Sequence, residues 1–264
     1  MNITQTYAKT HSEVTKLLTN RVILVTGASR SIGAATAKLL ARHGAAVGIN
    51  YYNSELAAHQ VVDAIASEGG KALAVKGDVR EIHQVETMVQ QVTEAFGAID
   101  TLVINANVLF RIAPFLEHSW EDFEAKLLGE LKGAFYPCKA VVPSMIKQQK
   151  GCIIAVSSIA SRYPNNGFSA HTTAKSGLDG FLKSLALELG PYGIRVNAIA
   201  PGLILTDALS STSQEWKDNT AQMTPLRRNG MVEDVAGAIL LMASEEAKFI
   251  TGTYLPVNGG AQIL

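Results

Sequence analysis

The chain has 264 residues, and its 23 basic and 23 acidic residues leave a formal net charge of zero. It contains no run of Lys and Arg of the kind that nucleic acids or anionic membrane surfaces favour, so we expect a small-molecule partner. The two cysteines, Cys138 and Cys152, have neither metal-ligand nor CxxC spacing, which indicates apolar core positions, no metal site and a reduced cytoplasmic setting. No apolar run approaches the ~20 residues of a membrane span, and the N-terminal residues do not resemble a secretory signal.

Short apolar runs bounded by turns alternate along the chain with longer segments of helical period. A helix is predicted between Ile82 and Phe96, where apolar residues recur every three or four positions. The runs predicted to be strands are Val22–Thr26, Ala46–Tyr51, Ala72–Lys76, Thr101–Ile104, Cys152–Val156, Arg195–Ala200 and Tyr254–Val257. This alternation predicts an α/β fold of the Rossmann type, a doubly wound parallel sheet of about seven strands in a single domain.

No linker or internal repeat divides the chain. Residues 1–18 are expected to be an N-terminal extension, frayed unless docked, and residues 19–264 to form the domain. Within it, residues 203–230 are rich in Ser, Thr and Asn and are expected to form a mobile substrate flap.

A glycine-bearing turn follows the first predicted strand and opens a helix that ends near Gly44. Backbone N–H groups at a helix start can bind a pyrophosphate, and Gly27 and Gly33 permit close approach of the backbone. A strand-to-helix turn also uses glycine for purely steric reasons, so this feature alone leaves phosphate binding and simple turn geometry equally open.

Five ordered motifs decide between these alternatives. They are Thr26-Gly27 with Gly33; Asp78-Val79; Asn197 to Gly202 with Thr206; Ile250-Thr-Gly; and the final Val257-Asn-Gly-Gly. From about Arg21 to Gln262 the chain resembles the short-chain dehydrogenase/reductase family. The resemblance implies a nicotinamide dinucleotide cofactor bound by Gly27, Ser29, Arg30, Ser31, Ile32, Gly33, Tyr51, Asp78, Val79, Asn105, Ala106, Lys175, Pro201, Gly202 and Thr206.

The second predicted strand ends Asn50-Tyr51-Tyr52-Asn53, without the carboxylate that commonly binds the ribose 2′-hydroxyl of NAD. Arg30 in the glycine turn offers a forked donor suited to a 2′-phosphate, or else it is a solvated loop residue. NADP(H) is therefore expected in preference to NAD(H). Two departures, Ser31 and Asn107 in place of family glycines, are expected to disturb the turns, although Asn tolerates positive φ.

The family's catalytic groups are a Ser, a Tyr, a Lys four residues after the Tyr, and an Asn. The resemblance places Ser158 and Lys175 at two of these positions, but His171 replaces the Tyr and Glu130 replaces the Asn. A nearby lysine is expected to depress the pKa of His171, whereas Glu130, paired with either residue, would oppose this. The sequence leaves open which effect is larger.

For His171 three interpretations remain: a working acid/base, a residue that shapes the substrate site, or the mark of a site that has decayed. Tyr163 is a further candidate, as a substitute phenol over the substrate cleft. The leading functional hypothesis is an NADP(H)-dependent reductase of a carbonyl or conjugated C=C, with C=C reduction preferred because an enolate tolerates a weaker proton donor. The alternative is a family member without redox activity, a lyase, isomerase or cofactor-binding interaction protein. The resemblance also implies a homotetramer or homodimer built through the helices around Leu127–Met145 and Lys175.

Overall fold

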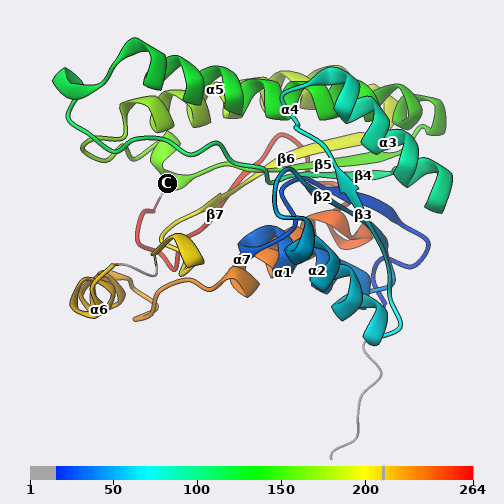
Figure 1. Ribbon diagram of the computed structural model, residues 1–264, viewed down its shortest axis with the longest axis horizontal. Helices are drawn as coiled ribbons and strands as arrows, with labels where there is room; N and C mark the ends of the chain where they lie inside the picture. The colour runs from blue at the N-terminus through cyan, green and yellow to red at the C-terminus, as the bar shows by residue number, and fades with distance from the viewer. Residues whose placement is uncertain (1–15, 210–211, 264) are drawn as a thin grey trace, which may run out of the picture.

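Seven apolar segments form one parallel sheet in the computed structural model of the protein, which describes residues 16–209 and 212–263. The strand order is β3-β2-β1-β4-β5-β6-β7, which reverses between β1 and β4 (Figure 1). The predicted strands are confirmed, each end within one residue. Their bounds are β1 Val22–Val25, β2 Ala46–Tyr51, β3 Lys71–Lys76, β4 Thr101–Ile104, β5 Gly151–Val156, β6 Ile194–Pro201 and β7 Tyr254–Val257.

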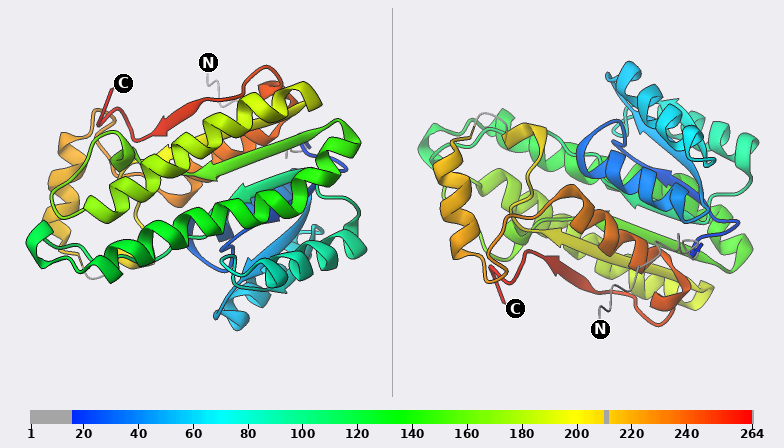
Figure 2. Two further views of the ribbon diagram at one scale, coloured as in Figure 1. Left: turned by 90° about the horizontal axis from the view of Figure 1, so that it is seen from above. Right: turned by 90° about the horizontal axis from the view of Figure 1, so that it is seen from below.

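Helices cover both faces of this sheet, which makes a single α/β domain of the predicted doubly wound kind (Figures 1 and 2). One layer contains α1 (Ser31–Arg42), α2 (Glu55–Ser67) and α7 (Val232–Ala243). The opposite layer contains α3 (Ile82–Phe96), α4 (Trp120–Gln148) and α5 (Ser169–Leu189). Among the described helices, none combines the length and apolar character that crossing a membrane requires.

Successive side chains along a strand point to opposite faces of the sheet, so the core is divided between the two helical layers. In β1, Ile23 and Val25 pack toward α1, α2 and α7, whereas Leu24 packs toward α3, α4 and α5. Cys152 and Cys138 are fully enclosed, one on each side, and burial raises the pKa of the Cys138 thiol to about 12. Both cysteines are core residues, as expected.

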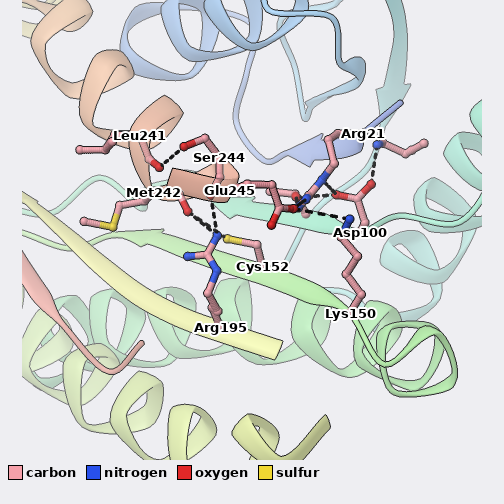
Figure 3. A network of polar contacts seen from close by, with 11 residues as sticks. Arg21, Asp100, Lys150, Cys152, Arg195, Leu241, Met242, Ser244 and Glu245 are labelled. Atoms are coloured by element: carbon pink, nitrogen blue, oxygen red, sulfur yellow. Dashed lines mark hydrogen bonds and ion pairs between the residues drawn. The ribbon is translucent and has the colours of Figure 1, made fainter. Parts of the chain in front are cut away.

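A polar network holds the sheet together at the end opposite its carboxyl edge (Figure 3). Arg21 donates to Asp100 at 2.5 Å and reaches Glu245, beyond the C-terminal end of α7, at 3.1 Å. Arg195 on β6 donates to the carbonyl oxygen of Met242 at 2.7 Å, where α7 leaves carbonyls without helical partners. These contacts fix one end of the sheet, while the loops at its other end carry the cavity described below.

Two predicted segments contain more ordered structure than the sequence suggested. The end of the proposed N-terminal extension is docked, because Leu18 is buried and its N–H donates to the carbonyl of His43 at 2.9 Å; residues 1–15 lie outside the described part. The proposed flap contains α6 (Gln214–Met223), capped by the Ser213 hydroxyl, and a parallel bridge joins Ile204 to Gly230. Whether this segment moves stays a prediction.

The turn that opens α1 carries backbone strain at Ser31. Its φ is 53°, in the left-handed region, and the preceding Gly27 has a φ of 61°. Glycine adopts this region freely, whereas a residue with a Cβ pays roughly 1–2 kcal/mol. The expected disturbance at Ser31 is therefore present as a strained backbone within an intact turn.

Ser31→Gly is predicted to relieve this strain. The free energy of unfolding should rise by about 1 kcal/mol, which corresponds to a Tm increase of about 2–4 °C for a chain of this size. Calorimetry of the wild type and of Ser31→Gly measures the change, with Ser31→Ala as the matched control because it keeps the Cβ. A glycine variant no more stable than the alanine variant would contradict the assignment of strain.

Candidate active site

A cavity of about 1020 Å³ opens at the carboxyl ends of the strands, beside the point where the strand order reverses. Sheets of this type bind ligands at that point. Its wall contains every residue that the resemblance assigned to the cofactor. These are Gly27, Ser29, Arg30, Ser31, Ile32, Gly33, Tyr51, Asp78, Val79, Asn105, Ala106, Lys175, Pro201, Gly202 and Thr206.

The glycine turn is held against β4 in a form that leaves space for a phosphate group. The Asn105 amide donates to the carbonyls of Thr26 and Gly27, each at 3.0 Å, and the Thr26 hydroxyl accepts from Asn105 N–H at 2.9 Å. A Cβ added at Gly33 would lie 2.5 Å from the Gly27 carbonyl oxygen. The start of α1 faces this space, so the residues present fit the diphosphate of a dinucleotide.

At the far end of the cavity the wall is cationic. Arg30 is exposed and makes no hydrogen bond or ion pair with any described residue. Arg80, which the sequence did not single out, binds the Asp78 carboxylate through both Nε and Nη2 and lies 5.8 Å from the centre of the Tyr52 ring. Those hydrogen bonds lower the pKa of Asp78.

Glu130 lies behind the cavity wall, between two lysines on the buried sides of α4 and α5. Its Oε1 accepts from Lys175 Nζ at 2.6 Å and its Oε2 from Lys126 Nζ at 2.5 Å. We call Lys126, Glu130 and Lys175 the ion triad. The expected pairing of Glu130 is therefore with Lys175, and Lys126 is an additional partner. The one sequence signal for Lys126 is its position four residues before Glu130 on the same helix.

Lys126 also anchors the loop after β4. Besides Glu130, its ammonium donates to Asn107 Oδ1 at 2.8 Å and to the Val108 carbonyl at 3.0 Å, so all three N–H groups are used. Asn107 does not adopt positive φ. The tolerance of Asn for positive φ is therefore not used at this turn, where the Asn107 side chain is held by Lys126.

The ion triad carries a net charge of +1. Burial opposes ionisation of Glu130, but the attraction of Lys175 and then Lys126 outweighs it, so the pKa of Glu130 lies below its ordinary value. Burial is the main cause that lowers the pKa of Lys126. Lys175 donates to Glu130 and to the Val156 carbonyl at 2.7 Å, which leaves one N–H for a ligand in the cavity.

His171 is enclosed by aromatic rings and is neutral. Its ring stacks on Phe110 with centroids 4.4 Å apart, and the edge of Phe168 contacts it at 5.8 Å. Burial, then Lys126 and Lys175, lower the pKa of His171 to about 4, and these effects outweigh the opposing charge of Glu130. The depressing effect is therefore the larger of the two that the sequence left open, with burial as its main cause. Its Nδ1 is buried and has no hydrogen-bond partner among the described residues, so Nε2 is the nitrogen that can meet a ligand.

A separate set of hydrogen bonds, to the backbone of Ser158 and to its neighbours, positions this residue. The Tyr254 hydroxyl donates to the Ser158 carbonyl at 2.9 Å, and Asp179 accepts from Ser157 Oγ at 2.5 Å and from Ser161 Oγ at 2.6 Å. The Ser158 hydroxyl accepts from Ala160 N–H at 3.2 Å, so its own hydrogen remains available to the cavity.

Tyr163 is not part of the cavity wall. The short helical turn Ile159–Ser161 directs the chain away from the cavity, so the Tyr163 ring packs against the core and its hydroxyl donates to the Ile263 carbonyl at 2.5 Å. The expectation that Tyr163 offers a substitute phenol is therefore wrong.

The fold and the cavity define a Rossmann-type α/β protein, and comparison with known proteins gives its family. A family model described as enoyl-(acyl carrier protein) reductase matches residues 27–262. A 3-oxoacyl-(acyl-carrier-protein) reductase of Staphylococcus epidermidis is 38% identical over 246 residues, 91% of this chain and 98% of the relative. One from Synechocystis sp. is 41% identical over 244 residues, 92% and 97% of the two chains.

A third relative, an L-rhamnose 1-dehydrogenase (NAD(P)(+)) of Sphingomonas sp., is 38% identical over 251 residues, 94% of this chain and 98% of the relative. The chain belongs to the short-chain dehydrogenase/reductase family of oxidoreductases. Glu130 and His171 both lie within the residues 27–262 that the family model matches.

The buried neutral imidazole predicts a pH-dependent stability. Because the folded state lowers the pKa of His171 from 6.5 to about 4, protons bind the unfolded state preferentially between those values. The contribution of His171 to the free energy of unfolding is therefore fully present above pH 6.5 and falls as the pH drops toward 4. Between pH 7 and pH 5, urea unfolding should show the wild type losing about 2 kcal/mol more than His171→Phe.

His83→Gln is the matched control, since His83 is exposed on α3. It should leave the pH dependence of unfolding close to that of the wild type. Equal losses for the wild type and His171→Phe would show that His171 titrates normally.

Proposed function

We propose that the chain is an NADP(H)-dependent reductase that acts on a conjugated C=C or a carbonyl of a small molecule. The observation that carries this proposal is the continuity of the cavity, which joins the glycine turn of α1 to Ser158, His171 and Lys175. A dinucleotide bound by the turn would place its reactive end beside these three polar groups. When bound, NADPH supplies the hydride, and the chain supplies binding and charge stabilisation.

NADP(H) is preferred because of charge at the far end of the cavity. Arg30 has no partner among the described residues, and the end of β2 has no carboxylate to repel a 2′-phosphate. Lys175 keeps one free N–H, which suits the hydroxyl groups of the nicotinamide ribose.

The lack of a readily released proton in the site favours conjugate reduction over carbonyl reduction. A neutral His171 can donate a hydrogen bond from Nε2 to a substrate oxygen, but it holds no readily released proton at pH 7. Carbonyl reduction creates an alkoxide that requires a proton at once, whereas an enolate spreads its charge and can be protonated at carbon by water. Hydrogen bonds from Ser158 and His171, together with the net +1 charge of the ion triad, would stabilise an enolate.

Two further candidates remain. Carbonyl reduction is supported by the relatives named as 3-oxoacyl reductases, while the family model carries the name of an enoyl reductase. A non-redox role, as a lyase, isomerase or cofactor-binding protein, is favoured by the engagement of Lys175 with Glu130 and by the stacking of His171 on Phe110.

We also propose that the chain forms a homotetramer or homodimer through the outer sides of α4 and α5. Leu128 and Phe135 on α4 are 44% and 48% exposed, and the Phe135 ring lies 6.1 Å from that of Phe181 on α5. Leu182 and Leu189 on α5 are buried in the core of the single chain and are unavailable to such an interface.

The proposed function predicts NADPH-dependent turnover of a panel of enones and simple ketones. The enones should react faster, and Lys175→Ala should weaken NADPH binding and abolish turnover. NADPH oxidation, with product analysis by mass spectrometry, measures both reactions. Tight NADPH binding without hydride transfer to any member of the panel would instead support the non-redox alternative.

The His171 variants test the proposed division of roles in the same assay. His171→Phe keeps the stacking on Phe110 and should lower enone turnover by about 10², the scale for one lost hydrogen-bond donor to an oxyanion, with NADPH affinity little changed. The double variant Glu130→Asn, His171→Tyr restores both family residues and should gain activity on ketones. Full activity of His171→Phe would remove His171 from the mechanism.

A further inference from the structure

Asp78 is buried in the cavity wall, and Arg80 occupies its acceptor sites. Asp78 Oδ1 accepts from the Arg80 backbone N–H and from Arg80 Nε, both at 2.9 Å. Asp78 Oδ2 accepts from Nε at 3.1 Å and from Nη2 at 2.6 Å. A carboxylate has about four acceptor positions, so Asp78 has little capacity left for another donor while Arg80 stays in place.

Few acidic residues line the cavity around this pair, although Glu81 lies close enough to Arg80 to raise its pKa. Among the described residues that line the cavity, the only acidic ones are Asp78 and Asp207, and Asp207 lies on the segment after β6. Tyr52, on the loop after β2, lies beneath the Arg80 guanidinium, and Arg30 belongs to the same wall. Arg80 is also the partner with more open space around it, since its side chain is 41% exposed and that of Asp78 is 10% exposed.

An adenosine 2′-phosphate brings two groups that match this pair. The exocyclic amino group of adenine is a donor that needs an acceptor, and Asp78 is the buried carboxylate available to it. The 2′-phosphate is an acceptor for a forked guanidinium donor. Each half of the Asp78–Arg80 pair therefore has a new partner in NADP(H), whereas NAD(H) offers a partner to Asp78 alone.

We propose that Arg80 is a specificity-determining residue that exchanges partners when the cofactor binds. The adenine amino group takes over acceptor sites on Asp78, and the Arg80 guanidinium turns past Tyr52 to the 2′-phosphate, which it binds together with Arg30. NAD(H) must open the same ion pair without offering Arg80 a replacement. The preference for NADP(H) thus has two sources: Arg80 attracts the 2′-phosphate of NADP(H), and binding of NAD(H) breaks the Asp78–Arg80 ion pair without replacing it. This inference rests on the proposed NADP(H) function.

The exchange is tested with two probes that differ only in the 2′-phosphate, adenosine 2′,5′-bisphosphate and 5′-AMP. Calorimetric titration of the full chain at fixed ionic strength gives both affinities. Arg80→Gln removes the guanidinium and releases Asp78. It should weaken binding of the bisphosphate and tighten binding of 5′-AMP, so that the ratio of the two affinities falls by roughly tenfold or more.

Two comparison variants separate the exchange from simpler explanations. Arg30→Gln removes a cation that has no partner to release, so it should weaken the bisphosphate and leave 5′-AMP unchanged. Arg42→Gln breaks an exposed ion pair with Glu68 that lies outside the cavity, and should change neither affinity.

Three results for Arg80→Gln would overturn the exchange: no change in either affinity, equal weakening of both, or weakening of the bisphosphate with 5′-AMP unchanged. The last would leave Arg80 as a plain phosphate ligand. Failure of the wild-type chain to bind either probe, or equal binding of both by the wild type, would instead overturn the proposed NADP(H) function. The two failures are therefore distinguishable.

Discussion

The burial of the Glu130 carboxylate is the constraint on which the chemistry of this cavity depends. A lone carboxylate at that depth would be neutral, because removing a charge from water costs several kcal/mol. Lys126 and Lys175 make the ionised form the stable one, each within 2.6 Å of a Glu130 oxygen. Loss of either lysine would leave a buried charge incompletely compensated, so the three residues act as a unit.

The positions of the neighbouring groups follow from this unit. The other two N–H groups of Lys126 donate to Asn107 and Val108. These hydrogen bonds fix the loop after β4, which carries Phe110. Phe110 covers His171, and the two lysines and burial together keep the imidazole neutral. Glu130 is thereby linked, through Lys126 and Phe110, to the environment of His171.

The sequence predicted the fold well because the relevant signals are local. Strands such as Val22–Val25 are continuously apolar since they are buried on both faces, and α3 shows its buried stripe in the spacing of Val85, Met88 and Val92. All the residues that the resemblance assigned to the cofactor lie in the wall of the cavity, which forms where the glycine turn and the carboxyl ends of the strands meet.

What the sequence did not predict depends on contacts between distant segments. The role of Lys126 requires knowing that α4 packs on α5 so that Glu130 faces Lys175. The pairing of Arg80 with Asp78 depends on side-chain rotamers that no periodicity encodes. Tyr163, a further candidate from the sequence, lies outside the cavity wall because a short helical turn after Ser158 changes the direction of the chain, and a separation of five residues does not reveal that change.

The central claim is that the protein holds a neutral His171 beside an ionised Glu130, and nitrogen NMR of the imidazole rings tests it most directly. Spectra of histidine labelled with ¹⁵N, recorded from pH 7 down to pH 5, identify the His171 ring by its absence in His171→Phe. The account predicts one neutral tautomer with its proton on Nε2, unchanged throughout that range. A His171 ring that gains a second proton near its ordinary pKa of 6.5 would contradict the account, because burial and the two lysines would then fail to keep the imidazole neutral.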